Sequence, residues 1–324
     1  MSNFRDNPCS VNFPGMFTGM GTFSVSYQIL EVQVRVHIAG ARVQMSVLNY
    51  NTDDNLTLEA RDLDFFMQYT RGGPWPEVEE AKELVRRVWL AVKAKYHTYR
   101  CIQSLSFLKP KVQNLEAYSK LLDVYREQGK VKVMDLGCCF GQETRKLIVD
   151  GIPPEMIWAV DVIDGYWTAG KELFNDQEDS KHRIEHVHTV FADPCAADVD
   201  GDISRVLTAD FDCVILMYVF HVLSLHQSEM LVQRMNLMLR KGGLVMGTCV
   251  GSTKAQEWQL TPDGKSARFL HSIGSLSELF MRCGFEDVVV KERDWEEGLG
   301  GPDSRWPEEE GVHRQRLEFR ATKI

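Results

Sequence analysis

The chain has 324 residues and a formal net charge of −9, with 44% hydrophobic residues. This length allows one large domain or two small ones, each with a full core. The acidic balance argues against a nucleic-acid partner, because the phosphate backbone favours a basic face. No apolar stretch reaches the ~20 residues that span a membrane, and the N-terminus lacks the pattern of a signal peptide. We therefore expect a cytoplasmic protein without a membrane span.

The cysteines have no CxxC pair and no Cys/His cluster with zinc spacing, so we expect reduced, buried thiols and no metal site. The eight are Cys9, Cys101, Cys138, Cys139, Cys195, Cys213, Cys249 and Cys283.

Residues 1–55 are interpreted as an N-terminal extension of unknown function. Residues 1–22 show no periodicity and are expected to be loosely ordered. Apolar and polar residues alternate over 23–48, with a break at Ala39-Gly40-Ala41, which predicts a β-hairpin.

Residues 56–130 are predicted to be helical. A short helix is expected over 56–71, an amphipathic helix from about Pro76, and a third helix over 114–129 that ends at Gly129. We expect this segment to form a lid that caps the substrate.

From residue 131 strand-like and helix-like runs alternate, which is typical of an α/β domain with a doubly wound, mostly parallel sheet. Two strand-like runs at the end, FEDVVVKERDW and HRQRLEFRATK, have no helix between them, only the acidic loop 296–312. They are therefore expected to be antiparallel. Arg268 and His271 lie in a polar block between the fifth strand and the next helix.

The stretch VMDLGCCFGQETRKL, residues 133–147, predicts a strand, a tight turn and a helix. Asp135 precedes Gly137, and Gly141 opens the helix; glycine lets a ligand approach the backbone closely. Asp161 closes the next strand 20 residues after Gly141 (161 − 141), the spacing of an acid that accepts ribose hydroxyls. The pattern predicts a nucleoside site at this edge of the sheet.

The window GCCFGQ lacks the middle glycine of the dinucleotide fingerprint, which admits a pyrophosphate. A carboxylate at Asp135 suits the amino group of an amino-acid-like tail. A nucleoside with a zwitterionic tail and no phosphate is S-adenosylmethionine (SAM). Cys138 supplies a small side chain beneath the ligand, and Gln142 lies in the first helical turn.

DLGCCFGQETRKL resembles motif I of the class I SAM-dependent methyltransferases, whose sheet carries an antiparallel C-terminal hairpin. FDCVILMYVFHVL resembles the motif of the fourth strand, beneath the methyl group, and Asp193 falls on the acid that faces the adenine. The cofactor-binding positions that the resemblance implies are Asp135, Gly137, Cys138, Gly141, Gln142, Asp161, Val162, Asp193 and Met217.

GCCFGQ, GKELF, Phe220-His221 and PDGKSARFLHSIGSLSELF resemble the fungal meroterpenoid and polyketide O-methyltransferases. Tyr99-Arg100-Cys101-Ile102 matches that family's YPCI loosely. The resemblance covers about residues 75–324, and the first ~55 residues match nothing in the family. It implies a SAM-binding domain over 131–324 that acts on a secondary metabolite.

Three residues are the catalytic candidates. His221 follows an apolar strand, and a neutral imidazole there takes a phenol proton or donates a hydrogen bond to a carboxylate; the alternative is a histidine that caps the next helix. Arg268 suits a substrate carboxylate, although a solvated loop cation fits the pattern equally. His271 belongs to the same late segment.

The sequence thus predicts a SAM-dependent O-methyltransferase that acts on a carboxyl or hydroxyl oxygen of a small molecule, as a monomer or homodimer. The alternatives are a SAM-binding scaffold without catalysis and an NAD(P)-dependent oxidoreductase, with a protein or RNA methyltransferase less favoured. No catechol-type carboxylate cluster is present to hold a metal.

Overall fold

The chain divides into two compact units, residues 1–51 and residues 52–324, and each is described by itself. The computed structural model describes residues 31–38, 41–48, 58–70, 78–96, 99–176, 182–196, 201–259, 267–295 and 311–324. None of the helices in these ranges is long and apolar enough to cross a membrane.

The first unit contains one antiparallel pair of strands, β1 (Glu31–Ile38) and β2 (Ala41–Leu48). Its register runs from Glu31 opposite Leu48 to Ile38 opposite Ala41. This confirms the hairpin predicted from the alternating pattern. The stretch expected to be loosely ordered lies outside the described residues.

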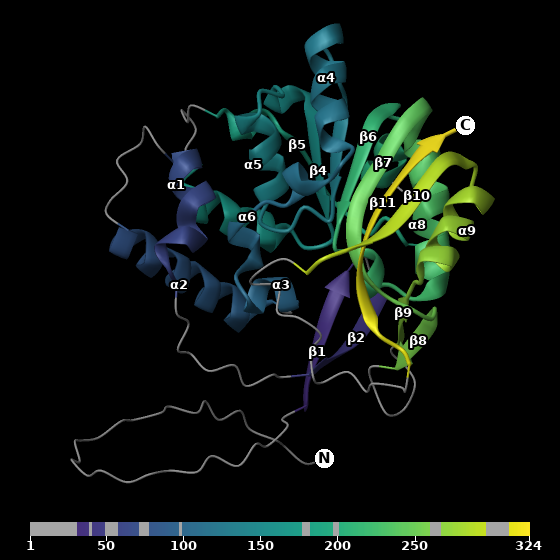
Figure 1. The fold of residues 1–324 in the computed structure, drawn as a ribbon. Helices are drawn as coiled ribbons and strands as arrows, with labels where there is room; N and C mark the ends of the chain where they lie inside the picture. Colours follow the sequence, from purple (N-terminus) through teal and green to yellow (C-terminus); the bar gives the residue numbers. More distant parts are fainter. Residues whose placement is uncertain are drawn as a thin grey trace, which may run out of the picture. The chain divides into compact units, whose positions relative to one another are not determined.

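The second unit is built on a seven-stranded sheet in the order β10-β11-β7-β6-β3-β4-β5 (Figure 1). The strands β3 to β7 pair in parallel, whereas β11 is antiparallel to both of its neighbours, as the sequence predicted. The strand bounds are β3 Val133–Leu136, β4 Ile157–Asp161, β5 His188–Phe191, β6 Phe211–Met217, β7 Leu239–Ser252, β10 Phe285–Arg293 and β11 Arg314–Lys323.

Both faces of the central strands are buried, because successive side chains of a strand point to opposite faces. In β6, Val214 and Leu216 join one core cluster, whereas Cys213, Ile215 and Met217 join another. These strands therefore read as continuous apolar runs in the sequence.

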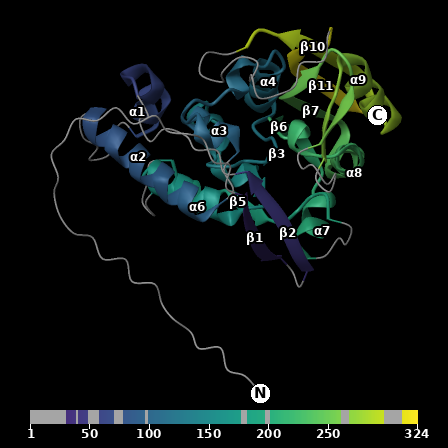
Figure 2. The same ribbon diagram turned by 90° about the horizontal axis from the view of Figure 1, so that it is seen from below.

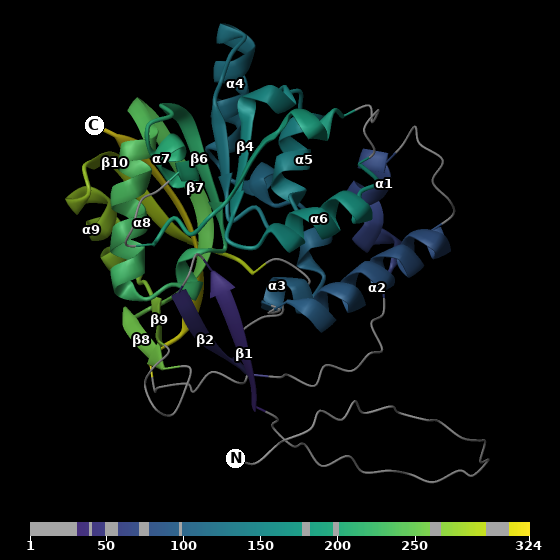
Figure 3. The ribbon, with the colours of Figure 1, turned by 180° about the vertical axis from the view of Figure 1, so that it is seen from behind.

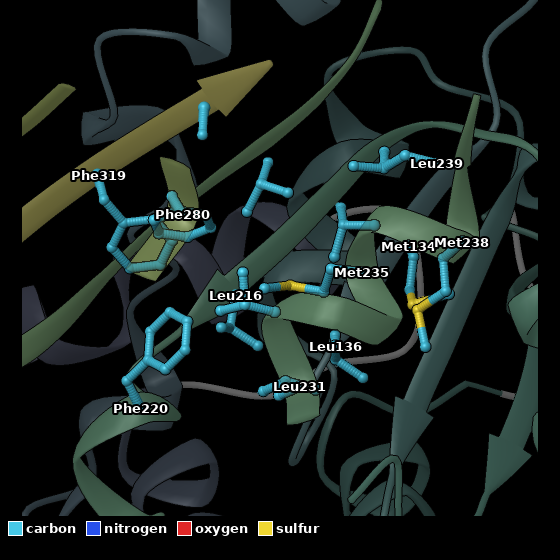
Figure 4. Packing of buried hydrophobic residues seen from close by; sticks show 14 of the residues in the cluster. Met134, Leu136, Leu216, Phe220, Leu231, Met235, Met238, Leu239, Phe280 and Phe319 are labelled. Atoms are coloured by element: carbon cyan, nitrogen blue, oxygen red, sulfur yellow. The ribbon is translucent and has the colours of Figure 1, made fainter. Parts of the chain in front are cut away.

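One face of the sheet is covered by α7 (Gly201–Leu207), α8 (Leu225–Met238) and α9 (Ile273–Arg282), whose apolar residues fill the first cluster. Figure 3 shows α7 and α8 in front of the sheet, and Figure 4 shows side chains of this cluster. The other face carries α4 (Tyr118–Gln128), α5 (Gln142–Val149) and α6 (Asp164–Leu173). The sheet is thus doubly wound.

The helices that precede the sheet in the sequence, from η1 to η2, form a third hydrophobic cluster with α6 and the turn after β3. The expected helix over 56–71 is present as η1 (Ala60–Leu63) and α1 (Asp64–Thr70), and the next as α2 (Val78–Lys95). Short turns follow: α3 (Arg100–Gln103), η2 (Ser106–Leu108) and η3 (Val112–Asn114). The α2 helix runs beside α6 (Figure 2), and a Cβ on Gly165 of α6 would lie 2.0 Å from the Tyr96 ring.

Two short strands between β7 and α9 were not predicted from the sequence. They are β8 (Gln256–Gln259) and β9 (Ala267–Leu270), which pair antiparallel. The signal was present in Pro262-Asp263-Gly264, a turn sequence between two short runs. Single turns complete the unit: η4 Pro154–Met156, η5 Ile184–His186 and η6 Phe220–Val222.

Candidate functional site

The turn after β3 is a glycine cradle. Gly137 and Gly141 have φ of 79° and 73°, the left-handed region that favours glycine. A Cβ on Gly137 would lie 2.5 Å from Val219 Cγ2, and one on Gly141 would lie 2.5 Å from the Trp167 ring. Because the space around both glycines is filled by neighbouring side chains, no larger residue fits there.

Asp161 closes β4 and turns its carboxylate toward this cradle. Its Oδ2 accepts a hydrogen bond from the Cys139 amide at 2.8 Å, and its Oδ1 accepts one from the Ile163 amide at 3.0 Å. Burial raises the pKa of this carboxyl, although the backbone donors oppose the shift. An ionised carboxylate has about four acceptor positions, so both oxygens retain capacity for ribose hydroxyls.

Asp135 is buried at the end of β3, with 1% of its surface exposed. Its Oδ2 accepts hydrogen bonds from the Thr144 amide at 3.0 Å and from Thr144 Oγ1 at 2.7 Å. Its Oδ1 is buried without a hydrogen-bond partner, and so is Oε1 of Gln142 in the adjacent helical turn. Burial raises the pKa of Asp135 to about 7, with a further contribution from the nearby carboxylates of Glu143 and Asp161.

Two buried oxygens without a hydrogen-bond partner lie beside a turn whose glycines leave no room for a Cβ. A ligand with a hydrogen-bond donor group fits this arrangement. Buried polar atoms are otherwise almost always hydrogen-bonded. The ammonium of a SAM tail supplies such donors, and Asp135, Gln142 and Asp161 are the residues that would hold the cofactor.

The other cofactor candidates lie at the same edge of the sheet. Asp193 is exposed in the loop after β5, where its Oδ1 accepts a hydrogen bond from the Cys195 amide at 2.7 Å. Cys138 is buried under the turn, and its pKa is raised by burial. Val162 is 44% exposed, and Met217 ends β6. All follow the carboxyl ends of parallel strands, where α/β sheets bind ligands.

His221 lies in η6, the turn after β6. The Val250 amide donates a hydrogen bond to Nδ1 of His221 at 3.5 Å, a long contact. The ring meets Tyr218 edge to face, with centroids 6.1 Å apart. Burial and the Arg268 cation lower the pKa of the half-buried His221 to about 3. The imidazole is therefore neutral at physiological pH.

Arg268 joins this group from β9. The hairpin is held against η6 by a hydrogen bond from the Phe269 amide to the Leu223 carbonyl at 2.7 Å. The Arg268 guanidinium acts electrostatically on His221 and on Tyr99, which precedes α3. Burial, followed by the Asp161 carboxylate, raises the pKa of Tyr99 to about 12, so Tyr99 is a neutral phenol. The charges of the cofactor acid Asp161 and of Arg268 therefore both act on Tyr99.

His271 is placed differently from the other two catalytic candidates. It is 1% exposed and packs edge to face against Phe269 and Phe220, with ring centroids 4.8 Å and 5.9 Å away. Its Nδ1 lies 3.3 Å from Ser275 Oγ, and its Nε2 has no hydrogen-bond partner. Burial lowers its pKa to about 4. This environment favours a role in supporting Phe220 and β9 over contact with the substrate.

Two buried ion networks were not anticipated from the sequence. The Glu143 carboxylate accepts hydrogen bonds from the backbone amides of Lys111 and Val112 at 2.9–3.0 Å and so ties the segment before α4 to α5. Arg145 forms an ion pair with Asp176, and both side chains are fully buried. The only sequence feature that pointed to either network was a pair of charged residues, Glu143 and Arg145, in the first two turns of the helix after Gly141.

Comparisons with known proteins find methyltransferases. No family model matches the chain. O-methyltransferase phiE of a fungal species is 27% identical over 249 residues, covering 72% of this chain and 77% of that protein. Methyltransferase adrK of Penicillium rubens is 26% identical over 201 residues, covering 61% and 69%. O-methyltransferase atr3 of Stereocaulon alpinum is 28% identical over 190 residues, covering 58% and 53%.

Among solved structures, the 1,6-didemethyltoxoflavin-N1-methyltransferase of Burkholderia thailandensis matches with a TM-score of 0.45 and 16% identity. The match covers 78% of this chain and 92% of that one.

In its strand order, in its glycine cradle with strand-end acids and in its sequence, the chain is similar to the class I SAM-dependent methyltransferases. Within that class it is similar to the fungal O-methyltransferases represented by phiE and atr3.

Proposed function

We propose that the chain transfers the methyl group of SAM to an oxygen of a small secondary metabolite, and that this oxygen belongs to a carboxyl group. The relatives phiE and atr3 are named O-methyltransferases, which supports oxygen as the acceptor atom. The observation that carries the choice of a carboxyl is the pairing of a neutral His221 with the Arg268 cation.

His221 acts in this proposal as a hydrogen-bond donor. A neutral imidazole has one N–H and one lone pair. Because Nδ1 accepts from the Val250 amide, the proton resides on Nε2, which donates to the substrate. A base whose pKa is near 3 is also poorly matched to a phenol with a pKa of about 10. A carboxylate is already ionised at neutral pH and needs no base.

Arg268 holds the carboxylate, since guanidinium and carboxylate planes match in a bidentate pair. Bound SAM supplies a methyl group already activated on a sulfonium. The residues of the chain therefore contribute orientation and exclusion of water more than proton transfer. His221 and Arg268 align one carboxylate oxygen for in-line attack, while Asp135 and Asp161 hold the cofactor on the opposite side.

Of the helical segment over 56–130, the part before η3 serves as the lid of this site, because η3 and α4 cover one face of the sheet. The charges of Asp161 and of Arg268 both act on Tyr99 in this part, which supports a position near both cofactor and substrate. Removing the part before η3 is expected to abolish turnover while the strands of the central sheet still form.

Turnover of a panel of aryl carboxylic acids and their matched phenols, measured as release of S-adenosylhomocysteine, tests the proposal. At saturating SAM we expect the acids to be methylated at a rate that is independent of pH between about 6 and 9, well above the pKa values of a carboxyl group and of His221. Arg268→Gln raises KM for the acid and leaves SAM affinity unchanged. Arg240→Gln, at the amino end of β7, is the matched control.

Methylation of the phenols alone, with a rate that rises with pH, contradicts the choice of a carboxyl. SAM binding without turnover of any substrate supports the scaffold alternative instead.

A further inference from the structure

The phenol of Tyr69 begins a buried chain of hydrogen bonds that ends at the cofactor cradle. Tyr69 lies in the last turn of α1 and is 3% exposed, and its hydroxyl donates to Asp176 Oδ1 at 2.7 Å. The other carboxylate oxygen, Oδ2, accepts from the Arg145 guanidinium, whose Nε lies 3.1 Å away. Arg145 Nη1 in turn donates to the carbonyls of Phe140 and Gly141, at 2.5 Å and 2.9 Å. Three side chains therefore connect the helical segment with the turn after β3.

Arg145 packs directly on the glycine that opens α5. A Cβ on Gly141 would lie 2.6 Å from Arg145 Nη1, and Gly141 has a left-handed φ of 73°. The guanidinium also lies over the rings of Phe174 and Trp167, 4.5 Å and 5.3 Å from their centroids. Gln142, whose buried Oε1 has no hydrogen-bond partner, follows Gly141 in the chain. A shift of the guanidinium would therefore turn the carbonyls of the cradle and displace the residues that would hold the cofactor.

Tyr69 is itself held in one orientation. Its ring stacks on the His182 imidazole, with centroids 4.2 Å apart and planes at 20°, and meets the Phe174 ring edge to face at 5.6 Å. His182 Nε2 lies 2.8 Å from the Tyr69 carbonyl. Burial raises the pKa of Tyr69, so the phenol stays neutral and keeps the proton that it donates. These contacts fix the direction of the hydroxyl toward Asp176.

We propose that Tyr69 is a positioning residue for the cofactor: by holding Asp176, and through it Arg145, it keeps the cradle in the geometry that binds SAM. This inference rests on the cofactor site proposed above. Because the Asp176 side chain is fully buried, loss of the phenol removes a donor that water does not replace, and the carboxylate reorients relative to Arg145. Such coupling is reciprocal, so SAM binding also strengthens the contact between Tyr69 and Asp176.

Tyr69→Phe tests the proposal, because it removes only the hydroxyl. We expect Kd and KM for SAM to rise about three- to tenfold, whereas kcat at saturating SAM and KM for the acid stay unchanged. Tyr118→Phe is the matched control. The Tyr118 hydroxyl donates to Asp150 Oδ2 at 2.6 Å, a bond of the same kind at the end of α5 that is far from the cradle. This control should lower the urea midpoint and leave Kd for SAM unchanged.

Hydrogen exchange separates positioning of the cradle from a general loss of stability. In the wild-type protein SAM should slow exchange of the amides of both α1 and the cradle, and in Tyr69→Phe it should slow only those of the cradle. An unchanged Kd for SAM in Tyr69→Phe overturns the proposal, as does protection of α1 by SAM that persists in this variant. An equal rise of Kd in Tyr118→Phe also overturns it, because the effect is then one of stability. Failure of the wild-type protein to bind SAM contradicts the cofactor site itself, an outcome distinct from a wild-type Kd that Tyr69→Phe leaves unchanged.

Discussion

The two halves of the site differ in the sign of their charges and in the way they are built. The cofactor half, at the ends of β3 and β4, holds the carboxylates of Asp135, Glu143 and Asp161, all buried. The substrate half, around η6 and β9, holds the Arg268 cation beside a neutral His221. The first half is one strand–turn–helix unit with its neighbouring strand, whereas the second is assembled from elements far apart in the sequence.

This difference matches the charges of the two reactants. A SAM molecule has a sulfonium, an ammonium and a carboxylate and is positive overall, which suits a half rich in carboxylates. A carboxylate acceptor suits the cationic half. Placing opposite charges on the two sides brings an electron-rich oxygen to an electron-poor methyl group, and in a site with little water these interactions are strong.

Loss of the Arg145–Asp176 ion pair is expected to have the largest effect. Arg145 also donates from Nη1 to the Phe140 carbonyl at 2.5 Å and to the Gly141 carbonyl at 2.9 Å, so the pair supports the cradle. Asp176→Asn leaves a buried guanidinium without its counter-charge, which costs about 3–5 kcal/mol of unfolding free energy. Urea denaturation measures this loss. SAM affinity should fall with it, because the cradle loses its support.

Arg87→Ala is the matched control for the ion pair. The Arg87–Glu172 pair, at 3.3 Å, also joins the helical segment to α6, but both of its side chains are more than half exposed. Such pairs contribute about 0–1 kcal/mol. Equal effects of the two substitutions would contradict the view that a buried network supports the cofactor half.

Asp161→Ala is expected to have the largest effect on cofactor binding. Without the carboxylate the ribose hydroxyls lose their acceptor, and SAM affinity should fall tenfold or more, about 1.4 kcal/mol. Calorimetric titration measures it. If KM for the acid substrate changes little in Asp161→Ala, the cofactor half and the substrate half act separately. A larger change in KM for the acid than in SAM affinity would contradict this, because the two halves would then not act separately.

The cofactor half could be predicted because its geometry is local. The glycines of the cradle are 4 residues apart (141 − 137), and Asp161 follows at a spacing that the next parallel strand imposes. The mostly parallel sheet was likewise predictable, because strands buried on both faces have continuous apolar sequences. The lack of a crossover helix between β10 and β11 predicted that these two strands are antiparallel.

The substrate half was less accessible to prediction because its contacts are long-range. Arg268 lies on β9, and neither β9 nor its partner β8 was predicted from the sequence. No spacing rule in a single sequence reports such contacts, so side chains brought together by packing required the structure.

A proton released on SAM binding is the smallest effect and tests the charge of the cofactor half directly. In the cofactor-free protein burial holds the pKa of Asp135 at about 7, above its usual 3.8. Between these values the native state binds a proton that the unfolded chain has lost, so the free energy of unfolding falls as pH rises through this window. An ammonium at Oδ1 favours the ionised form of Asp135. Binding of SAM below pH 7 therefore releases up to one proton, and SAM affinity rises at most about tenfold from pH 6 to pH 8.

Calorimetry in two buffers of different ionisation enthalpy counts the protons released on SAM binding. Asp135→Asn should remove the release, and Asp123→Asn on α4 should retain it. Release that persists in Asp135→Asn would mean that another group meets the cofactor tail.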